Sequence, residues 1–230
     1  YCLKHKRNGI QDKRFYLIGD SHSAHFFFMA EKALEKTNYK LGHISSINKK
    51  EFPRNFIVEI EKDDKQKLIE EIIKYSRSGD IVSISFHKGR LNKKRNIHIR
   101  TKSKDNIDRN KKLAYAKLKF SKFINKLDKK GIKVLLIRDT PLLKTPNIDI
   151  STCVLQEKFT KWNQCDVTHK QDNITRSAQD NLYDYLEDKF SNVFIWDPRE
   201  FMLSKHDKYS YDSDKGLRMM NDQNHITKEF

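Results

Sequence analysis

Two short segments, far apart in the sequence, carry residue types that could perform acyl chemistry. The first is Gly19-Asp20-Ser21, which follows a short apolar run and therefore predicts a tight turn between a buried strand and a helix. At the start of a helix, a serine hydroxyl can act as a nucleophile and the serine N–H can stabilise a developing oxyanion. Ser21 could equally be no more than the N-cap of the helix, a common role for serine. The segment alone leaves both interpretations open.

The second segment lies near the C-terminus, where Asp222 and His225 are close enough to share one helical turn. A serine hydroxyl attacks well only when a base removes its proton, and an imidazole is a better base when an acceptor holds its other nitrogen. His225 as the general base and Asp222 as its orienting partner satisfy both needs. This spacing occurs by chance in many proteins, so it gains weight only in combination with Ser21.

The residues between these segments alternate between strand and helix patterns. Apolar runs predict strands over residues 14–18, 42–47, 81–86, 133–137 and 193–196. Helical periodicity lies between them, with helices predicted over residues 27–37, 65–75, 113–129 and 177–190. Parallel strands need crossover helices, so we predict an α/β fold with a three-layer, doubly wound parallel sheet of about five strands, similar to flavodoxin. Such sheets bind ligands at the carboxyl ends of their strands, where Ser21 is expected.

Two stretches, residues 88–112 and 140–171, do not fit this alternation and are expected to be excursions from the sheet. The length of 230 residues suits a single domain over residues 1–230. The longest apolar run, Phe26 to Ala30, is far shorter than the roughly 20 residues that span a bilayer, and too short for the core of a signal peptide.

The chain is strongly basic, with 47 basic and 31 acidic residues and a formal net charge of +16. Such a surface could bind an anionic glycan, an acidic lipid or a nucleic acid, or could simply be solvated. Cys2, Cys153 and Cys165 form no C-x-x-C pair, and no histidines have zinc-finger spacing, so we expect no structural metal. His22 and His25 flank Ser21, but residues after a nucleophile usually pack or cap, so we expect no metal there either.

Together, the two segments resemble those of the SGNH hydrolase family, in which a GDS block follows the first strand and a D-x-x-H block lies near the C-terminus. The similarity extends to the SGNH domain fused to acyltransferase family 3 membrane proteins, which O-acetylate bacterial envelope glycans. It spans residues 15–227 and rests on residues 19–23, residues 222–227, Thr140-Pro141 and the pair Cys153 and Cys165.

The resemblance implies that Ser21 is the nucleophile, His225 the general base and Asp222 its orienting partner. The chain would then accept an acyl group, most simply acetyl, from an acyl donor onto Ser21 and pass it to a hydroxyl of an envelope polysaccharide, without a cofactor. Two alternatives stay open. One is an SGNH-type carbohydrate esterase that passes the acyl group to water, and the other is a non-catalytic basic module that binds an anionic glycan.

Simple members of the family complete the oxyanion hole with a Gly and an Asn from blocks that this chain lacks. The Ser21 N–H, Gly42 and Asn92 are the candidates here. His87, at the carboxyl end of the strand over residues 81–86, is expected to line the pocket. The basic stretch that follows provides candidates for binding an anionic substrate, namely Lys93, Lys94 and Arg95.

The resemblance also implies an extracytoplasmic domain, in the periplasm or on the outer face of the cytoplasmic membrane. A membrane acyltransferase domain in the same full-length chain would tether it, and no nucleic-acid partner is expected. A Cys153–Cys165 disulfide fits that location, with two buried thiols as the alternative, while the partner of Cys2 is open. Since the sequence begins with Tyr1 and not with Met, we expect it to be a fragment of a longer, membrane-attached protein.

Overall fold

The computed structural model describes residues 13–45, 67–91, 109–143, 165–204, 206–210, 219–220 and 226–227. The chain divides into two compact units. The first consists of Tyr1–Arg138 and Ser177–Trp196, and the second of Asp139–Arg176 and Asp197–Phe230. The single domain expected over residues 1–230 stays a prediction.

A five-stranded parallel sheet forms the centre of the first unit. Its strands are β1 (Lys13–Gly19), β2 (Tyr39–Ser45), β3 (Ile81–Ser85), β4 (Lys133–Ile137) and β6 (Val193–Trp196). They lie in the order β2-β1-β3-β4-β6, and every neighbouring pair is parallel. The predicted α/β fold with a doubly wound parallel sheet is therefore confirmed.

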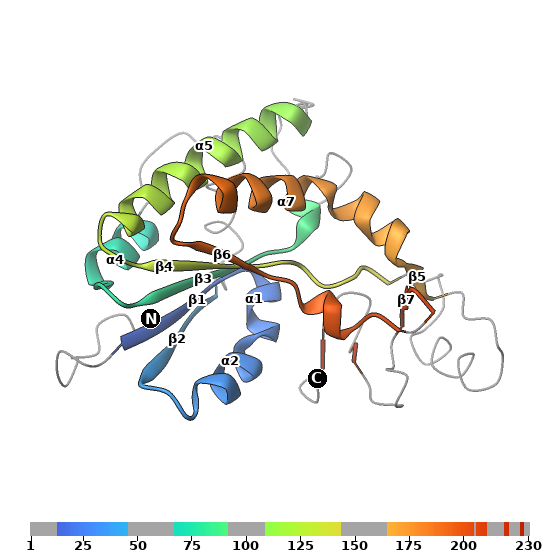
Figure 1. Cartoon of the computed structure of the whole chain (residues 1–230), viewed down its shortest axis with the longest axis horizontal. Helices are drawn as coiled ribbons and strands as arrows, with labels where there is room; N and C mark the ends of the chain where they lie inside the picture. The colour runs from blue at the N-terminus through green and yellow to red at the C-terminus, as the bar shows by residue number, and fades with distance from the viewer. Residues whose placement is uncertain are drawn as a thin grey trace. The chain divides into compact units, whose positions relative to one another are not determined.

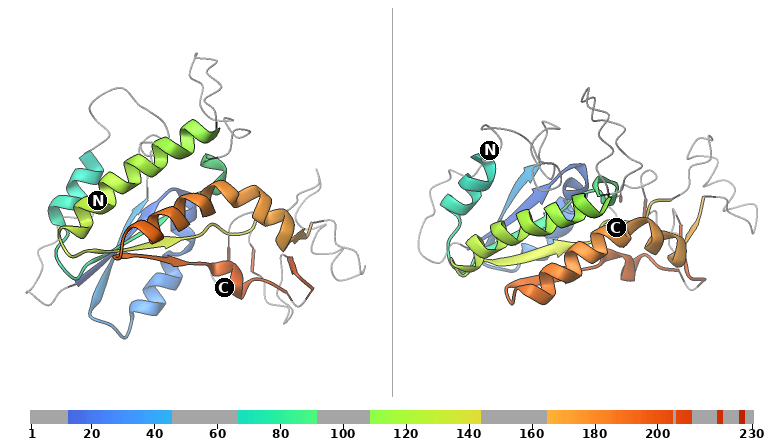
Figure 2. Two further views of the ribbon diagram at one scale, coloured as in Figure 1. Left: turned by 45° about the horizontal axis from the view of Figure 1, so that its top comes forward. Right: turned by 90° about the horizontal axis from the view of Figure 1, so that it is seen from above.

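Helices cover both faces of this sheet and so create three layers (Figure 1). On one face lie α1 (Ser21–His25) and α2 (Phe27–Leu34), and on the other lie α4 (Lys67–Tyr75), α5 (Arg109–Asp128) and the C-terminal part of α7 (His169–Lys189) (Figure 2). Right-handed crossovers explain this division, because the chain steps one way from β1 to β2 and the opposite way from β2 onward. The direction changes between β1 and β3, whose carboxyl ends form the topological switch point at which α/β sheets bind ligands.

The core of the first unit follows from the periodicity of its sequence. Alternate residues of β3 and the residue after it, Val82, Ile84 and Phe86, are fully buried and pack with Phe120 and Ile124 of α5. The ring centroids of Phe86 and Phe120 lie 6.0 Å apart. The strand is buried from Val82 onward, Ser83 and Ser85 included, but its apolar side chains recur at a period of two, and together with those at a period of about four in the helix they anchor α5 to the sheet.

Two glycines end helices in this unit. Gly79 (φ 83°) follows α4 and Gly131 (φ 67°) follows α5, and both adopt the left-handed conformation that favours glycine. The Gly79 N–H donates to the Gly131 carbonyl at 3.2 Å, so the two turns support each other at the amino ends of β3 and β4.

Four predicted boundaries differ from the structure by three residues or more, and one of them is the end of α2 at Leu34, where we predicted residue 37. Helix α5 begins at Arg109 and not at 113, and α7 begins at His169 and not at 177. Both extensions are rich in polar residues and lack a clear apolar stripe, so hydrophobic periodicity does not reveal them. Strand β2 spans Tyr39–Ser45, whereas we predicted residues 42–47, of which 46 and 47 lie outside the described residues.

In the described residues of the second unit, the longest regular element is the N-terminal part of α7. Strand β5 (Val167–Thr168) pairs antiparallel with β7 (Lys208–Tyr209), and a short 3-10 helix, η4 (Pro198–Phe201), follows β6 in the chain. Residues 140–171 were expected to be an excursion from the five-stranded sheet, and the described ones contain the start of α7 and β5, which belongs to the separate two-stranded sheet.

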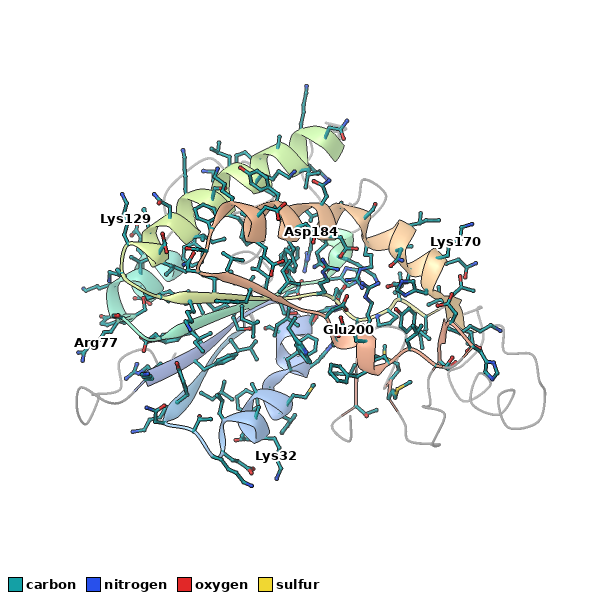
Figure 3. All side chains as sticks on the ribbon, in the orientation of Figure 1. Lys32, Arg77, Lys129, Lys170, Asp184 and Glu200 are labelled. Atoms are coloured by element: carbon teal, nitrogen blue, oxygen red, sulfur yellow. The ribbon has the colours of Figure 1, made fainter. Side chains whose placement is uncertain are left out.

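Charged side chains occupy much of the surface of the described residues. Lys32 on α2 and Lys129 after α5, both labelled in Figure 3, are exposed and extend into solvent. None of the helices in the described ranges has the length and the hydropathy of a membrane span.

Candidate active site

Ser21 stands at the carboxyl end of β1, as predicted. It is exposed and is the first residue of α1. The N-cap of α1 is Asp20, whose Oδ1 accepts the His22 N–H at 3.0 Å, so the alternative that Ser21 caps the helix is wrong. Within the described residues, neither Oγ nor the N–H of Ser21 has a hydrogen-bond partner. Both groups can therefore face a substrate.

The close approach of β1, β3 and α1 behind Ser21 requires a glycine at position 19. A Cβ on Gly19 would lie 1.7 Å from the Ser85 carbonyl oxygen and 2.7 Å from the Ser23 Cβ. Because β1 and β3 are hydrogen-bonded neighbours at this point, neither backbone can move aside without opening the sheet. The glycine of the GDS segment is thus explained by packing and not by an unusual φ angle.

Asp20 joins the ends of the two central strands. Its buried carboxylate accepts the N–H of His22 from α1, the N–H of His87 after β3 at 3.2 Å, and the Nε–H of Arg90 at 3.2 Å. Arg90 belongs to the 3-10 helix η2 (Lys88–Arg90). The role of Asp20 was not predicted, although an Asp between a strand and a helix is a common N-cap and is recognisable in the sequence.

His87 lies at the carboxyl end of β3, next to the segment that carries Ser21. Its Nδ1 accepts the Gly89 N–H at 3.0 Å, and its ring meets the edge of His22, with centroids 4.5 Å apart. The His22 and His25 rings lie 5.1 Å apart. Three imidazoles are therefore packed together beside Ser21. Among the described residues, no group of His, Cys, Asp and Glu side chains could hold a metal ion.

Gly42 is not brought to Ser21. It lies inside β2 opposite Tyr16, whereas the carboxyl end of β2, Ser45, lies opposite Gly19. At about 3.3 Å per residue, Gly42 is roughly 10 Å from the sheet edge at which Ser21 stands. We predicted that this strand begins at Gly42, whereas it begins at Tyr39, so Gly42 lies in the middle of the strand.

Several predicted site residues lie outside the described residues and stay predictions. They are Asp222, His225, Asn92, Lys93, Lys94, Arg95, Cys2 and Cys153. Of the predicted disulfide pair, only Cys165 is described, and it is fully buried immediately before β5.

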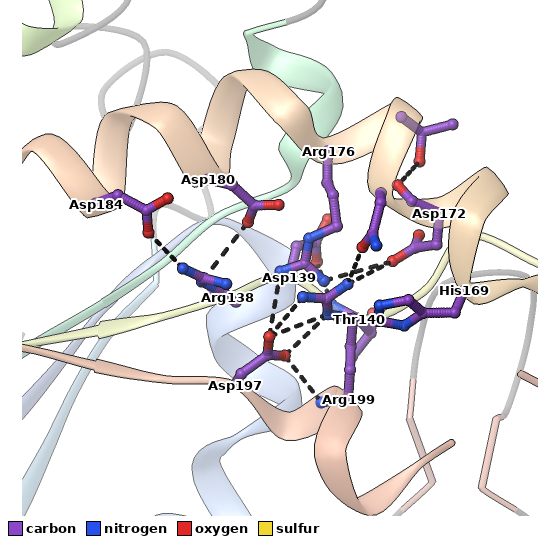
Figure 4. A network of polar contacts seen from close by, with 12 residues as sticks. Arg138, Asp139, Thr140, His169, Asp172, Arg176, Asp180, Asp184, Asp197 and Arg199 are labelled. Atoms are coloured by element: carbon purple, nitrogen blue, oxygen red, sulfur yellow. Dashed lines mark hydrogen bonds and ion pairs between the residues drawn. The ribbon is translucent and has the colours of Figure 1, made fainter. Parts of the chain in front are cut away.

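A buried network of charges in the second unit was missed by the sequence analysis (Figure 4). Arg199 binds Asp197 with two nitrogens, Nε to Oδ1 at 2.9 Å and Nη2 to Oδ2 at 2.6 Å. Asp172 Oδ2 lies 3.4 Å from Nη1 of Arg176 and 3.5 Å from Nη1 of Arg199. Asp172 and Arg176 are completely buried. These ion pairs fasten η4 to the N-terminal part of α7.

Tyr209 of β7 adds a hydrogen bond to this unit, with its hydroxyl 2.7 Å from Nδ1 of His169. Burial raises the pKa of Tyr209, and the negative charges of Asp172 and Asp197 raise it further. In the first unit a separate cluster joins Arg138, after β4, to Asp180 and Asp184 of α7 (Figure 4).

The sheet order and the exposed serine at its switch point define a doubly wound α/β protein. More specifically, the sequence model described as "SGNH domain (fused to AT3 domains)" matches residues 1–230, and the chain belongs to this family. No curated protein matches the sequence. Family membership supports an enzyme that transfers acyl groups or hydrolyses their esters.

Solved structures with the same fold are only distantly similar in sequence. The periplasmic domain of a lipopolysaccharide acetyltransferase from Salmonella ser. Paratyphi A is 15% identical, with a TM-score of 0.56 over 97% of this chain and 80% of that chain. A GDSL-like lipase from Bacteroides thetaiotaomicron is 12% identical, with a TM-score of 0.54 over 98% of this chain and 85% of that chain. At such identities the likeness shows the fold alone.

Proposed function

We propose that this chain is a serine-dependent acyltransferase domain. It passes an acetyl group from Ser21 to a hydroxyl of a bacterial envelope polysaccharide. The position of Ser21 carries the proposal. Its side chain is exposed at the switch point of the sheet, and Asp20 has taken over the capping of α1. Family membership and the fold shared with a lipopolysaccharide acetyltransferase domain support this proposal.

The reaction uses one base and one nucleophile in two steps. First, His225 accepts the proton of Ser21 Oγ while Oγ attacks the acyl carbonyl, and the donor leaves with that proton. Then the acceptor hydroxyl gives its proton to His225 and attacks the acyl-serine ester, and Ser21 Oγ leaves with that proton, which restores the free serine and the neutral imidazole. Asp222 orients the imidazole and stabilises its positive form. The Ser21 N–H donates to the oxyanion in both steps, and Asn92 is the second donor in this proposal.

The domain is proposed to act outside the cytoplasm, tethered by a membrane acyltransferase domain of the same full-length protein that supplies the acyl group. The family description, which records the fusion to AT3 domains, supports this partner. Lys93, Lys94 and Arg95 are proposed to contact an anionic glycan. A Cys153–Cys165 disulfide suits an oxidising compartment, and the complete burial of Cys165 would protect it.

Ester hydrolysis is the second candidate, favoured by the exposure of Ser21 to solvent. Water would replace the glycan hydroxyl in the second step, and the same three residues would act. The two activities differ in the acceptor alone, so product analysis separates them.

The test starts from turnover of 4-nitrophenyl acetate by the wild type and three variants. Ser21→Ala and His225→Ala should each lower kcat at least about 1000-fold, and Asp222→Asn should retain more activity. Ser191→Ala, which alters an exposed serine before β6, is the matched control and should keep full activity. A fluorophosphonate probe should label Ser21. Unlabelled Ser21 and unchanged turnover in all variants would favour a non-catalytic binding module.

Mass spectrometry of an added envelope polysaccharide then distinguishes transfer from hydrolysis. A transferase should acetylate the polysaccharide in proportion to donor consumed, whereas an esterase should release free acetate and leave the polysaccharide unchanged.

A further inference from the structure

Within the described residues, Arg90 is held in place through one of its nitrogens. Its Nε donates to Asp20 Oδ2 at 3.2 Å, and this carboxylate is itself fixed by the backbone N–H groups of His22 and His87. The Asp20 carboxylate is therefore a fixed anchor for the Nε side of the guanidinium group. An arginine whose side chain is already ordered loses little entropy when it binds a ligand.

The other end of the guanidinium is open. Within the described part of the chain, Nη1 and Nη2 of Arg90 have no hydrogen-bond partner, and 41% of the side chain is exposed. These two nitrogens carry four N–H donors that form part of a planar fork. Such a fork matches the two oxygens of a carboxylate or a phosphate.

The surroundings of Arg90 favour a negative ligand. The segments that meet around Arg90, residues 20–25 and 86–91, contain one acidic side chain, Asp20, and two basic ones, of which Lys88 is buried and Arg90 is exposed. Asp20 is only 5% exposed, so its charge is directed to Arg90 and to backbone N–H groups and not to solvent. An incoming anion would meet the positive face of Arg90 first.

We infer that Arg90 binds a carboxylate or phosphate group of the substrate beside the reacting ester. Ser21 directly follows Asp20 in the chain, with Cα atoms about 3.8 Å apart, and Arg90 is hydrogen-bonded to the Asp20 carboxylate. Asp20 therefore holds the guanidinium group near the nucleophile. The acceptor is then an acidic glycan, containing a uronic acid or a sugar phosphate, and the anion positions the neighbouring hydroxyl. This inference rests on the proposed function only in taking the bound anion to be part of the acceptor.

Binding of simple sugars tests this site without any assay of turnover. Isothermal titration would compare glucuronate, glucose 6-phosphate and neutral glucose with the wild type, Arg90→Gln and Arg90→Lys. The wild type should prefer at least one anionic sugar over glucose about tenfold or more, and Arg90→Gln should abolish that preference. Arg90→Lys keeps the charge but not the fork, so it should retain only part of the preference. The better of the two anionic sugars identifies the acidic group that the site takes.

Arg77→Gln is the matched control, because Arg77 is exposed in the turn before β3, at the opposite edge of the sheet (Figure 3). It removes the same charge and should leave the preference intact. If Arg77→Gln and Arg90→Gln reduce the preference for the anionic sugar equally, the attraction is a general electrostatic one and the inference is overturned. A wild type that prefers neither anionic sugar over glucose would overturn it too. Circular dichroism verifies that each variant is folded. If the preference depends on Arg90 while Ser21 resists labelling, the site stands and the proposed chemistry fails.

Discussion

The two units of this chain are stabilised by different interactions. In the first, buried apolar residues from the sheet, α4, α5 and α7 form one continuous cluster. In the second, two arginines and two aspartates form a network of ion pairs in which Asp172 and Arg176 are completely buried, beside buried apolar side chains such as Met202 and Met220. Apolar packing is non-directional but sensitive to volume, whereas buried ion pairs need good geometry to offset the loss of hydration.

This difference bears on the candidate site. Ser21 and Asp20 sit on the apolar sheet, where tight packing at Gly19 fixes the backbone behind the nucleophile. The network in the second unit instead fixes a chain segment, η4, by specific contacts to α7. We expect the first unit to be sensitive to added volume and the second to lost charge.

The largest effect is expected from Gly19→Ala in the first unit. The new Cβ would overlap the Ser85 carbonyl oxygen, so destabilisation should exceed the usual cost of overpacking, about 1–3 kcal/mol, and reach about 4 kcal/mol or more. Urea unfolding measures the loss. Gly42→Ala is the matched control, since its Cβ would meet the Tyr16 ring at an ordinary 3.4 Å and should change stability by less than about 1 kcal/mol. Similar losses in both variants would contradict this account of Gly19.

The next effect concerns the buried charges of the second unit. Asp172→Asn keeps the shape of the side chain but leaves Arg176 and Arg199 short of one negative partner, which should cost about 3 kcal/mol. Amide hydrogen exchange in η4 and in residues 172–176 reports this loss locally. Asp188→Asn, on the exposed end of α7, should cost less than about 0.5 kcal/mol. If the amide hydrogens of η4 and of residues 172–176 exchange at the same rate in both variants, the network is not what stabilises this unit.

The sequence predicted the first unit well and the second poorly, for physical reasons. Strands β4 and β6 were predicted residue for residue, because an apolar run closed by polar residues is the local signature of a buried strand. The first two turns of α7 were missed because Asp172 and Arg176 look like surface residues in the sequence, and only tertiary pairing shows them to be buried.

The candidate site divides in the same way. Ser21 was predicted because the GDS segment is local, and its placement after β1 follows from one strand and one turn. Arg90 was not singled out, because its contact with Asp20 joins residues 70 positions apart in the chain. Gly42 was misjudged because the start of the edge strand β2 has a weak apolar pattern.

Tyr209→Phe should produce a smaller, pH-dependent effect in the second unit. Losing the hydrogen bond to His169 should cost about 1 kcal/mol near neutral pH. Because the folded state raises the pKa of Tyr209, the unfolded chain ionises first, and stability falls as pH rises above the ordinary value of 10.0. The variant lacks this ionisation, so the difference in free energy of unfolding between the wild type and the variant should shrink between pH 9 and about 11. A constant difference over this range would show that Tyr209 titrates normally. Tyr115→Phe, on α5 of the first unit, controls for the loss of a hydroxyl.

The smallest effect is expected where an ion pair of the first unit lies at the surface. Lys32 and Glu35 approach to 3.2 Å, but their side chains are 80% and 51% exposed, so water and salt screen the attraction. Glu35→Gln should therefore lower the free energy of unfolding by less than about 0.5 kcal/mol, and 0.5 M salt should remove the difference. Asp172→Asn makes the same kind of change, yet its effect should persist in salt because the Asp172 pairs are shielded from solvent. A salt-independent loss at Glu35 comparable to that at Asp172 would mean that burial does not distinguish the two units.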